Sequence, residues 1–121
     1  MLGFTDVFFC PMLVNDLAQV LMRMAQAGLS GLYHVVSPKC TSKYDFGAAL
    51  ARDFGLDERL ISPVSIAASD LKVVRSPRLT LRCDKLKQAL DGLLPDWESG
   101  LKHFYELYRQ GYPQQLRKMA I

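Results

Sequence analysis

The first third of the chain alternates between short apolar runs and helical spacing of apolar residues. Residues 4–10 are β-branched and aromatic and end at a proline, which is typical of a strand that leads into a turn. Apolar positions at helical spacing then predict a helix that Asn15 or Asp16 caps and that Gly28 ends. The apolar run 31–36 predicts a second, largely buried strand. Strand, helix and strand together indicate a parallel crossover.

The middle of the chain contains the clearest helix signal. Ser42 and Asp45 stand at capping-box spacing before an apolar helical pattern, and Gly55 follows its end. Residues 60–64 predict an edge strand at best, because the proline at position 63 cannot donate to a ladder. Between residues 65 and 77 the pattern weakens, so we expect an irregular loop with a helical turn over 67–71.

The last third predicts two helices and a loose end. One helix begins at Asp84 and runs through Leu90, and the other runs from Asp96 to Gly111. After the proline at position 113 no partner pattern follows, so residues 113–121 are expected to form a frayed tail. No repeat or low-complexity run divides the chain, which is therefore predicted to be one unit.

Composition supports an ordinary folded domain. The chain has 121 residues, of which 50% are hydrophobic and 22% are charged, which excludes two full domains and a disordered chain. A net charge of +3 with interspersed signs gives no basis for a nucleic-acid partner. The apolar run 7–14 is broken by Pro11 and flanked by acidic residues, so we expect neither a signal peptide nor a membrane partner.

The three cysteines are Cys10, Cys40 and Cys83. They form an odd set with no CxxC pair and no neighbouring histidine. Neither a disulfide framework nor a metal site is therefore expected. Reduced thiols and a cytoplasmic location fit this pattern best.

Motifs for redox catalysis and hydrolysis are missing from the sequence. A dinucleotide site needs closely spaced glycines between a strand and a helix, but the nearest pair, Gly28 and Gly31, follows a helix. None of the five tyrosines has a lysine four residues later, and Tyr105 with Arg109 comes nearest, on a helix face where packing is the simpler role. There is no GxSxG elbow, and both histidines are expected to be structural. We assign no catalytic, cofactor-binding or metal-binding residue.

Six short blocks stand out along the chain: 8–18 (FFCPMLVNDLA), 31–35 (GLYHV), 41–46 (TSKYDF), 61–64 (ISPV), 75–78 (RSPR) with Leu81 and Lys85-Leu86, and 94–101 (LPDWESGL). In this order they resemble the C-terminal part of the dTDP-4-dehydrorhamnose reductase family of extended short-chain dehydrogenases. Together they span about residues 6–110, and no single block would be specific alone.

This resemblance implies an α/β fold in which partial Rossmann-like strands carry a C-terminal helical substrate-binding lobe. Residues 1–112 would form that substrate-binding portion. The family transfers hydride from NADPH to the keto carbon of a dTDP-sugar. Its cofactor domain and TyrxxxLys dyad lie upstream of the matching region, so the chain alone is predicted to be inactive and to bind no cofactor. It would be a fragment, a split-gene product or a short natural protein.

The resemblance also points to two candidate substrate-binding residues, Arg75 and Arg78. Related nucleotide-sugar enzymes commonly use a loop arginine at this place to contact the phosphates, and a guanidinium can bind phosphate oxygens in pairs. The family more often has Arg-Pro here than Arg-Ser-Pro-Arg, so the sequence leaves open which arginine would bind. The alternative is two solvated loop arginines.

A second hypothesis is a non-catalytic module that binds a nucleotide sugar or another protein. In the related fold, the strands at 4–10 and 31–36 would lie against elements that this chain does not encode. We therefore expect the apolar side chains of Phe8, Leu32 and Val36 to be uncovered. Uncovered strands predict either self-association or docking of the missing Rossmann half.

Overall fold

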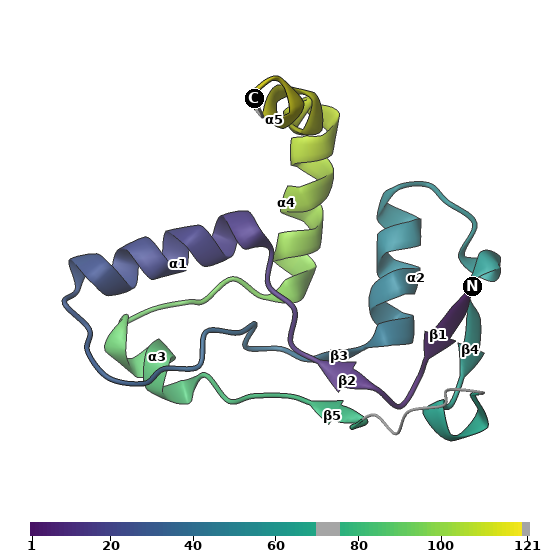
Figure 1. Cartoon of the computed structure of the whole chain (residues 1–121), viewed down its shortest axis with the longest axis horizontal. Coiled ribbons are helices and arrows are strands. Elements are labelled where there is room, and N and C mark those ends of the chain that lie inside the picture. The colour runs from purple at the N-terminus through teal and green to yellow at the C-terminus, as the bar shows by residue number, and fades with distance from the viewer. Residues whose placement is uncertain (70–75, 120–121) are drawn as a thin grey trace.

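The computed structural model of the chain describes residues 1–69 and 76–119. Short strands occupy the middle of the fold and helices surround them (Figure 1). The elements are β1 Leu2–Phe4, β2 Phe8–Phe9, α1 Val14–Gln26, β3 Thr41–Ser42, α2 Lys43–Asp53, the 3-10 helix η1 Glu58–Leu60, β4 Ser62–Val64, the 3-10 helix η2 Ile66–Ala68, β5 Arg78–Leu79, α3 Asp84–Ala89, α4 Trp97–Arg109 and α5 Tyr112–Met119.

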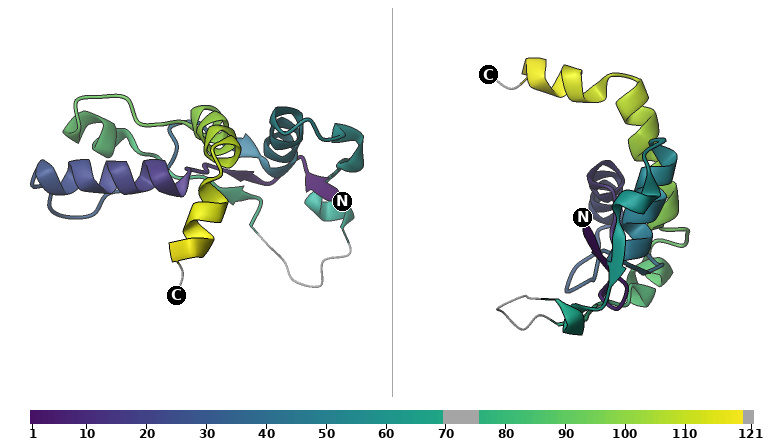
Figure 2. Two further views of the ribbon diagram at one scale, coloured as in Figure 1. Left: turned by 90° about the horizontal axis from the view of Figure 1, so that it is seen from above. Right: turned by 90° about the vertical axis from the view of Figure 1, so that its right-hand side faces the viewer.

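The molecule is open in shape. In Figure 1, α1 and α3 lie on one side of the central strands, and α2, β1 and β4 lie on the other. Figure 2 shows that most elements form a thin curved layer, from which α4 and α5 extend. A layer of this kind leaves much of each strand uncovered.

The strands form two small sheets. β1 pairs in parallel with β4, while β2 lies between β3, which is antiparallel to it, and β5, which is parallel. The predicted strand over 4–10 is therefore interrupted. At the interruption the Asp6 carboxylate accepts hydrogen bonds from the Ser65 hydroxyl and the Ile66 amide, at 2.5 and 2.9 Å. The predicted edge strand over 60–64 is confirmed over Ser62–Val64 as β4, whereas Leu60 belongs to η1.

The prediction of a strand over 31–36 is wrong. In the described part of the chain this segment joins no ladder, and it is held by side chains instead. The Lys85 ammonium donates to the Leu32 carbonyl at 2.8 Å and lies 4.1 Å from the centre of the Tyr33 ring. His34, expected to be buried, is exposed, with Nδ1 3.3 Å from the Arg82 carbonyl oxygen. The predicted crossover from 4–10 through a helix to 31–36 is therefore not formed in the described part of the chain, where β2 pairs instead with β3 and β5.

The predicted loop over 65–77 begins with η2, and residues 70–75, with the end of the helical turn expected over 67–71, lie outside the described part of the chain. β5 was not predicted as a strand. β5 is only two residues long, and its pairing with β2 is a contact between segments far apart in the sequence. Periodicity carries no signal for a strand this short.

Two helices begin as their sequences predict. At α2, Ser42 Oγ accepts from the Asp45 amide at 3.0 Å and donates to the Asp45 carboxylate at 2.6 Å. Gly55, with φ of +64°, follows the end of α2. At α4 the Asp96 carboxylate caps the Ser99 amide at 2.9 Å. These local signals are confirmed.

The predicted cap of α1 is wrong. The helix follows Leu13, which makes no side-chain cap hydrogen bond. Asn15 and Asp16 lie inside the first turn, and their side chains reach other helices. Asn15 Nδ2 donates to the Tyr112 hydroxyl at 3.3 Å, and Asp16 contacts His103 on α4.

The tail is helical rather than frayed over residues 113–119, because α5 covers Tyr112–Met119. Gly111 adopts φ of +76°, which turns the chain after α4. Pro113 is tolerated in the first turn, where no intrahelical amide donor is required. The amides of Gln114 and Gln115 then donate to the Gly111 carbonyl at 3.1 and 3.2 Å.

Two apolar clusters hold the layer together. Val20, Cys83, Leu86 and Leu94 are buried between α1 and α3, with Val35 and Val36 packed against them. Val36 is therefore partly covered, contrary to expectation, whereas Phe8 is 42% and Leu32 78% exposed. The second cluster joins α2 to α4 and centres on Phe54, which packs on Phe104, Tyr105 and Tyr108. The packing role predicted for Tyr105 is confirmed.

The cysteine prediction is wrong for two of the three residues. Cys10 and Cys40 form a disulfide, while Cys83 is a buried free thiol. The reason is the register of β2 and β3, in which Phe9 faces Thr41. One further step in that antiparallel register places Cys10 opposite Cys40, with the two Cα atoms 4.1 Å apart.

Candidate functional site

The three-stranded sheet has one covered face and one open face. Phe9 of β2 packs edge-on against Phe46 of α2, with ring centres 5.5 Å apart, and Phe46 packs on Trp97. Lys43 Nζ lies 4.9 Å from the centre of the Phe9 ring. Successive strand residues point to opposite faces, so Phe8 points away from α2. Its 42% exposure agrees with this placement.

Arg78 shares the open face with Phe8. The two residues are partners in the parallel β2–β5 register, and partners in a ladder point to the same side of a sheet. Arg78 is exposed. It forms no ion pair with any residue in the described ranges. The open face therefore places the apolar ring of Phe8 beside the positively charged guanidinium of Arg78.

The Ser-Pro sequence before Arg78 explains how that arginine is positioned. Ser76 Oγ accepts from the Arg78 amide at 3.3 Å and donates to the Arg78 carbonyl at 3.1 Å. The Pro77 carbonyl accepts from the Phe8 amide at 2.8 Å, which starts the β2–β5 pairing. Arg75, the other sequence candidate, lies outside the described residues. The structure thus gives a position to Arg78 alone.

Asp6 lies in the bend between β1 and β2. The Ser65 hydroxyl and then the Ile66 amide lower the pKa of its carboxyl by hydrogen bonding to the charged form. Both carboxylate oxygens thus have neutral donors. Asp6 therefore holds the backbone where β2 begins, and these two hydrogen bonds satisfy its carboxylate without an arginine partner.

An aspartate–histidine contact joins α1 to α4 and was not predicted. His103 Nδ1 lies 2.7 Å from Asp16 Oδ1, with the aspartate side chain 15% and the histidine side chain 41% exposed. The sequence predicts a structural role for His103, because no carboxylate stands at a spacing typical of a catalytic pair. Asp16 and His103 are 87 positions apart. A pair separated by this distance has no sequence signal. Its position between two helices supports the structural role assigned to His103.

Two further features concern metals and membranes. Within residues 1–69 and 76–119, the structure brings together no group of three or more His, Cys, Asp or Glu side chains that could hold a metal ion. No helix in the same ranges is long and apolar enough to cross a membrane.

Two solved structures with similar folds are dTDP-4-dehydrorhamnose reductases. A dTDP-4-dehydrorhamnose reductase from Bacillus anthracis in complex with NADP gives a TM-score of 0.75 at 21% identity, over 87% of this chain and 37% of that chain. The ortholog from Clostridium acetobutylicum gives 0.75 at 20% identity, over 90% and 39% of the two chains. The predicted α/β fold class, that of an extended short-chain dehydrogenase, is confirmed.

The family model for the RmlD substrate binding domain matches residues 4–110, and the chain belongs to this family. A probable low-salt glycan biosynthesis reductase from Haloferax volcanii is 29% identical over 98 residues, which are 81% of this chain and 33% of that protein. The chain thus spans about a third of the length of this curated relative. The family resemblance read from the six sequence blocks is confirmed.

Proposed function

We propose that this chain is the nucleotide-sugar-binding portion of an NADPH-dependent reductase of dTDP-sugar biosynthesis. The observation that carries the proposal is the pairing of Arg78 with Phe8 on the open face of the β3–β2–β5 sheet. Membership of a substrate-binding domain family supports it. The substrate-binding portion would comprise residues 1–112.

Arg78 is the residue we assign to the diphosphate. It is exposed, forms no ion pair with another described residue and has its backbone fixed by Ser76. A guanidinium can donate two parallel hydrogen bonds to phosphate oxygens, and each charge-assisted bond is stronger than a neutral one. The exposed ring of Phe8 offers a flat apolar surface beside that charge. Arg75 is the second candidate for the same role.

The residues of this chain do not fit a dinucleotide cofactor. A pyrophosphate site needs glycines between a strand and the helix that follows it. The β2–α1 connection, residues 10–13, has none, and β3 runs into α2 without any connecting residue. Gly28 and Gly31, both at positive φ, follow α1 instead. We therefore propose that NADPH and the TyrxxxLys dyad belong to a Rossmann half, and that this chain alone transfers no hydride.

The proposed partner is that Rossmann half. The proposed location is the cytoplasm on the ground of the NADPH-dependent family alone, because the disulfide between Cys10 and Cys40 removes the argument from reduced thiols. The curated relative is about three times as long as the matched segment, which leaves room for a cofactor domain. Phe8 of β2, Leu79 of β5 and Leu32 beside α3 are exposed, so they are available for docking.

Calorimetric titration of the purified chain with dTDP-glucose and, separately, with NADPH tests the proposal. We expect the sugar nucleotide to bind and NADPH not to bind. Arg78→Gln should weaken dTDP-glucose binding about tenfold or more, because a hydrogen bond to a charged group contributes about 1.5–3 kcal/mol. Arg75→Gln, measured in parallel, decides which arginine contacts the diphosphate.

Arg109→Gln is the matched control. Arg109 is an exposed arginine in the last turn of α4, away from the sheet. Its loss should leave the affinity unchanged. NADPH binding to the chain would overturn the proposal, as would equal affinity for dTDP-glucose in the wild type and in the variant lacking both Arg75 and Arg78.

A non-catalytic interaction module is the second candidate. The observation that favours it is the exposure of Leu32 at 78% together with Leu79 at 53%. The gene neighbourhood separates the two functions. An adjacent reading frame that encodes a Rossmann half favours the reductase portion, and its absence favours the interaction module.

A further inference from the structure

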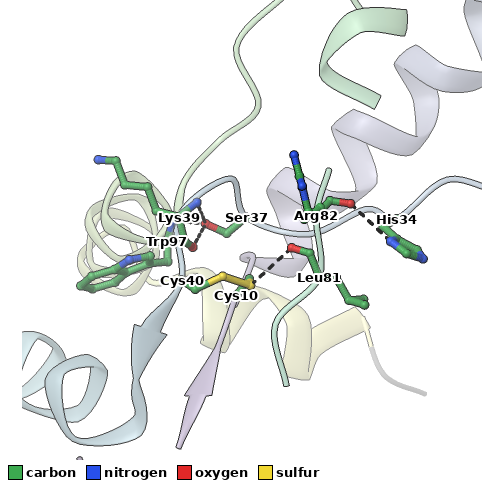
Figure 3. The surroundings of a disulfide bond; sticks show 8 residues. All are labelled: Cys10, His34, Ser37, Lys39, Cys40, Leu81, Arg82 and Trp97. Carbon is green, nitrogen blue, oxygen red and sulfur yellow. Dashed lines mark hydrogen bonds between the residues drawn. A yellow bond between two sulfur atoms is a disulfide. The ribbon is translucent and has the colours of Figure 1, made fainter. Parts of the chain in front are cut away.

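All three cysteines lie in or next to one groove beside the paired strands β2 and β3. The groove has a volume of about 400 Å³ and is lined by Cys40 and Cys83, and Cys10 is bonded to Cys40 at its edge. Figure 3 shows the disulfide between the segment that follows β2 and the segment that precedes β3, with Leu81 next to Cys10. The groove therefore gives a small molecule access to one side of the disulfide.

The two cysteines of the disulfide differ in exposure. Cys40 is exposed and lines the groove, whereas Cys10 is 8% exposed. Attack by a thiolate requires access to the sulfur atom. An incoming thiol can therefore reach Cys40 and makes Cys10 the leaving group.

The surroundings of Cys10 suit a leaving thiol. Cys10 Sγ lies 3.8 Å from the Leu81 carbonyl oxygen. A disulfide sulfur carries no hydrogen, so this contact becomes a donor–acceptor pair only after reduction. The Cys10 thiol would then have an acceptor in place without movement of the chain.

Charge in the groove favours an anionic thiol. Arg82, Asp84 and Lys87 line it. Arg82 Nε lies 2.8 Å from the Asp84 carboxylate and neutralises it. Lys87 is exposed and forms no ion pair with a described residue, so one positive charge remains. A cation beside the disulfide raises the local concentration of a negatively charged thiol.

We propose that the Cys10–Cys40 disulfide is a reversible exchange site for a small anionic thiol, which bonds to Cys40. The thiolate attacks Cys40 Sγ, and the Cys10–Cys40 bond breaks. Cys10 leaves with the electron pair and takes a proton from water, which gives a mixed disulfide at Cys40. A second thiolate then attacks the small-molecule sulfur, releases Cys40 as a thiolate and forms the small disulfide. Two small thiols are oxidised, and the protein disulfide is reduced.

Cys83 takes no part in this exchange. It is 5% exposed and packs with Val20, Leu86 and Leu94 in the core between α1 and α3. A buried structural cysteine of this kind is inert toward reagents in solution. Cys83 therefore serves as an internal reference within the same molecule.

Reduced glutathione, a thiol with two carboxylates, is the probe. The intact, oxidised chain is incubated with it at neutral pH, quenched with acid and mapped by peptide mass spectrometry. We expect the mixed disulfide on Cys40, free thiol on Cys10 and no adduct on Cys83. The Cys10→Ser variant treated with oxidised glutathione should hold the adduct on Cys40, while Cys40→Ser should label much more slowly at Cys10.

Lys87→Gln tests the role of charge. It should slow reduction by glutathione about fivefold, the effect of one nearby charge, and slow reduction by 2-mercaptoethanol less, because the attacking thiolate of glutathione carries the larger negative charge. Lys102→Gln, an exposed lysine on α4, should change neither rate. An adduct on Cys10, a Cys40–Cys83 disulfide, or a wild-type disulfide that glutathione leaves intact would overturn the proposal. None of these outcomes depends on nucleotide-sugar binding.

Discussion

At the residue scale, Asp96 combines a helix cap with an ion pair. Its carboxylate lies 2.7 Å from Lys39 Nζ and 2.9 Å from the Ser99 amide. The hydrogen bond from Lys39, followed by that from Ser99, lowers the Asp96 pKa from 3.8 to about 2. The folded state therefore favours the charged carboxylate. This contribution to stability is complete above the ordinary pKa and is lost as the pH falls through about 2.

Two substitutions of Asp96 separate the cap from the charge. Asp96→Asn keeps a capping oxygen, so at neutral pH it should cost less than Asp96→Ala, which should lower the free energy of unfolding by about 1 kcal/mol. Both variants should lose the part of the acid dependence between pH 4 and 2 that Asp96 supplies, in urea unfolding measured across that range. Glu106→Gln, on the exposed side of α4, should retain it. An unchanged acid profile in Asp96→Asn would contradict the assignment.

Gly3 and Gly47 make a second residue-scale comparison. A Cβ atom at Gly3 would lie 2.9 Å from Ile61 Cγ2 and 3.2 Å from the Tyr44 Cα, closer than packed atoms allow. At Gly47, inside α2, it would lie 3.4 Å from Ile61 Cδ1. Gly3→Ala should therefore destabilise the chain by about 1–3 kcal/mol. Gly47→Ala should be neutral or stabilising by up to about 1 kcal/mol, because alanine is the better helix former. Equal urea midpoints for the two variants would refute this.

At the scale of elements, the start of α2 could be predicted from the sequence, whereas the outcome for residues 31–36 and for β5 could not. The α2 capping box lies within four residues, and the sequence contains all of it. By contrast, residues 31–36 have the composition of a strand but find no ladder partner in the described part of the chain. β5 is a strand only because its backbone pairs with that of β2. Pairing in space decided both cases.

The candidate site followed the same rule. The family resemblance identified Arg78 as a candidate, and the β2–β5 register places Phe8 beside it. The contact between Asp16 and His103 and the disulfide had no such guide, because each joins residues that are distant in the sequence. Cysteine spacing reports disulfides only where a known framework repeats, and three cysteines without a CxxC pair do not form one.

The disulfide also predicts a property of the β2–β3 pair. That ladder contains two residue pairs, so it depends strongly on the covalent link beside it. The bonded cysteines are 30 residues apart, and closing a loop of that size lowers the entropy of the unfolded chain by an amount worth about 3–4 kcal/mol. Reduction with dithiothreitol should therefore lower the melting temperature of the wild type. Cys40→Ser should already melt at the lower temperature and should not respond to reductant.

At the scale of the whole molecule, the open layer leaves large apolar side chains uncovered. Phe8, Leu79 and Leu81 on and near the central strands are 42%, 53% and 49% exposed. α4 and α5 extend from the layer (Figure 2). They form an apolar groove of about 420 Å³ with the start of α1. Large exposed apolar surfaces commonly mark sites of association.

The exposed strand surface predicts that the purified chain self-associates unless a partner covers it. Sedimentation velocity at increasing concentration should show oligomers, and the chain should bind a hydrophobic dye. The double variant Phe8→Ser with Leu79→Ser should reduce both signals, because it removes exposed apolar area from β2 and β5 without touching the two apolar clusters. Leu93→Ser is the matched control, since Leu93 is 90% exposed but lies beyond α3, outside the strands. A wild-type chain that remains monomeric and dye-free at all concentrations, or a control variant that lowers both signals as far as the double variant, would contradict the prediction.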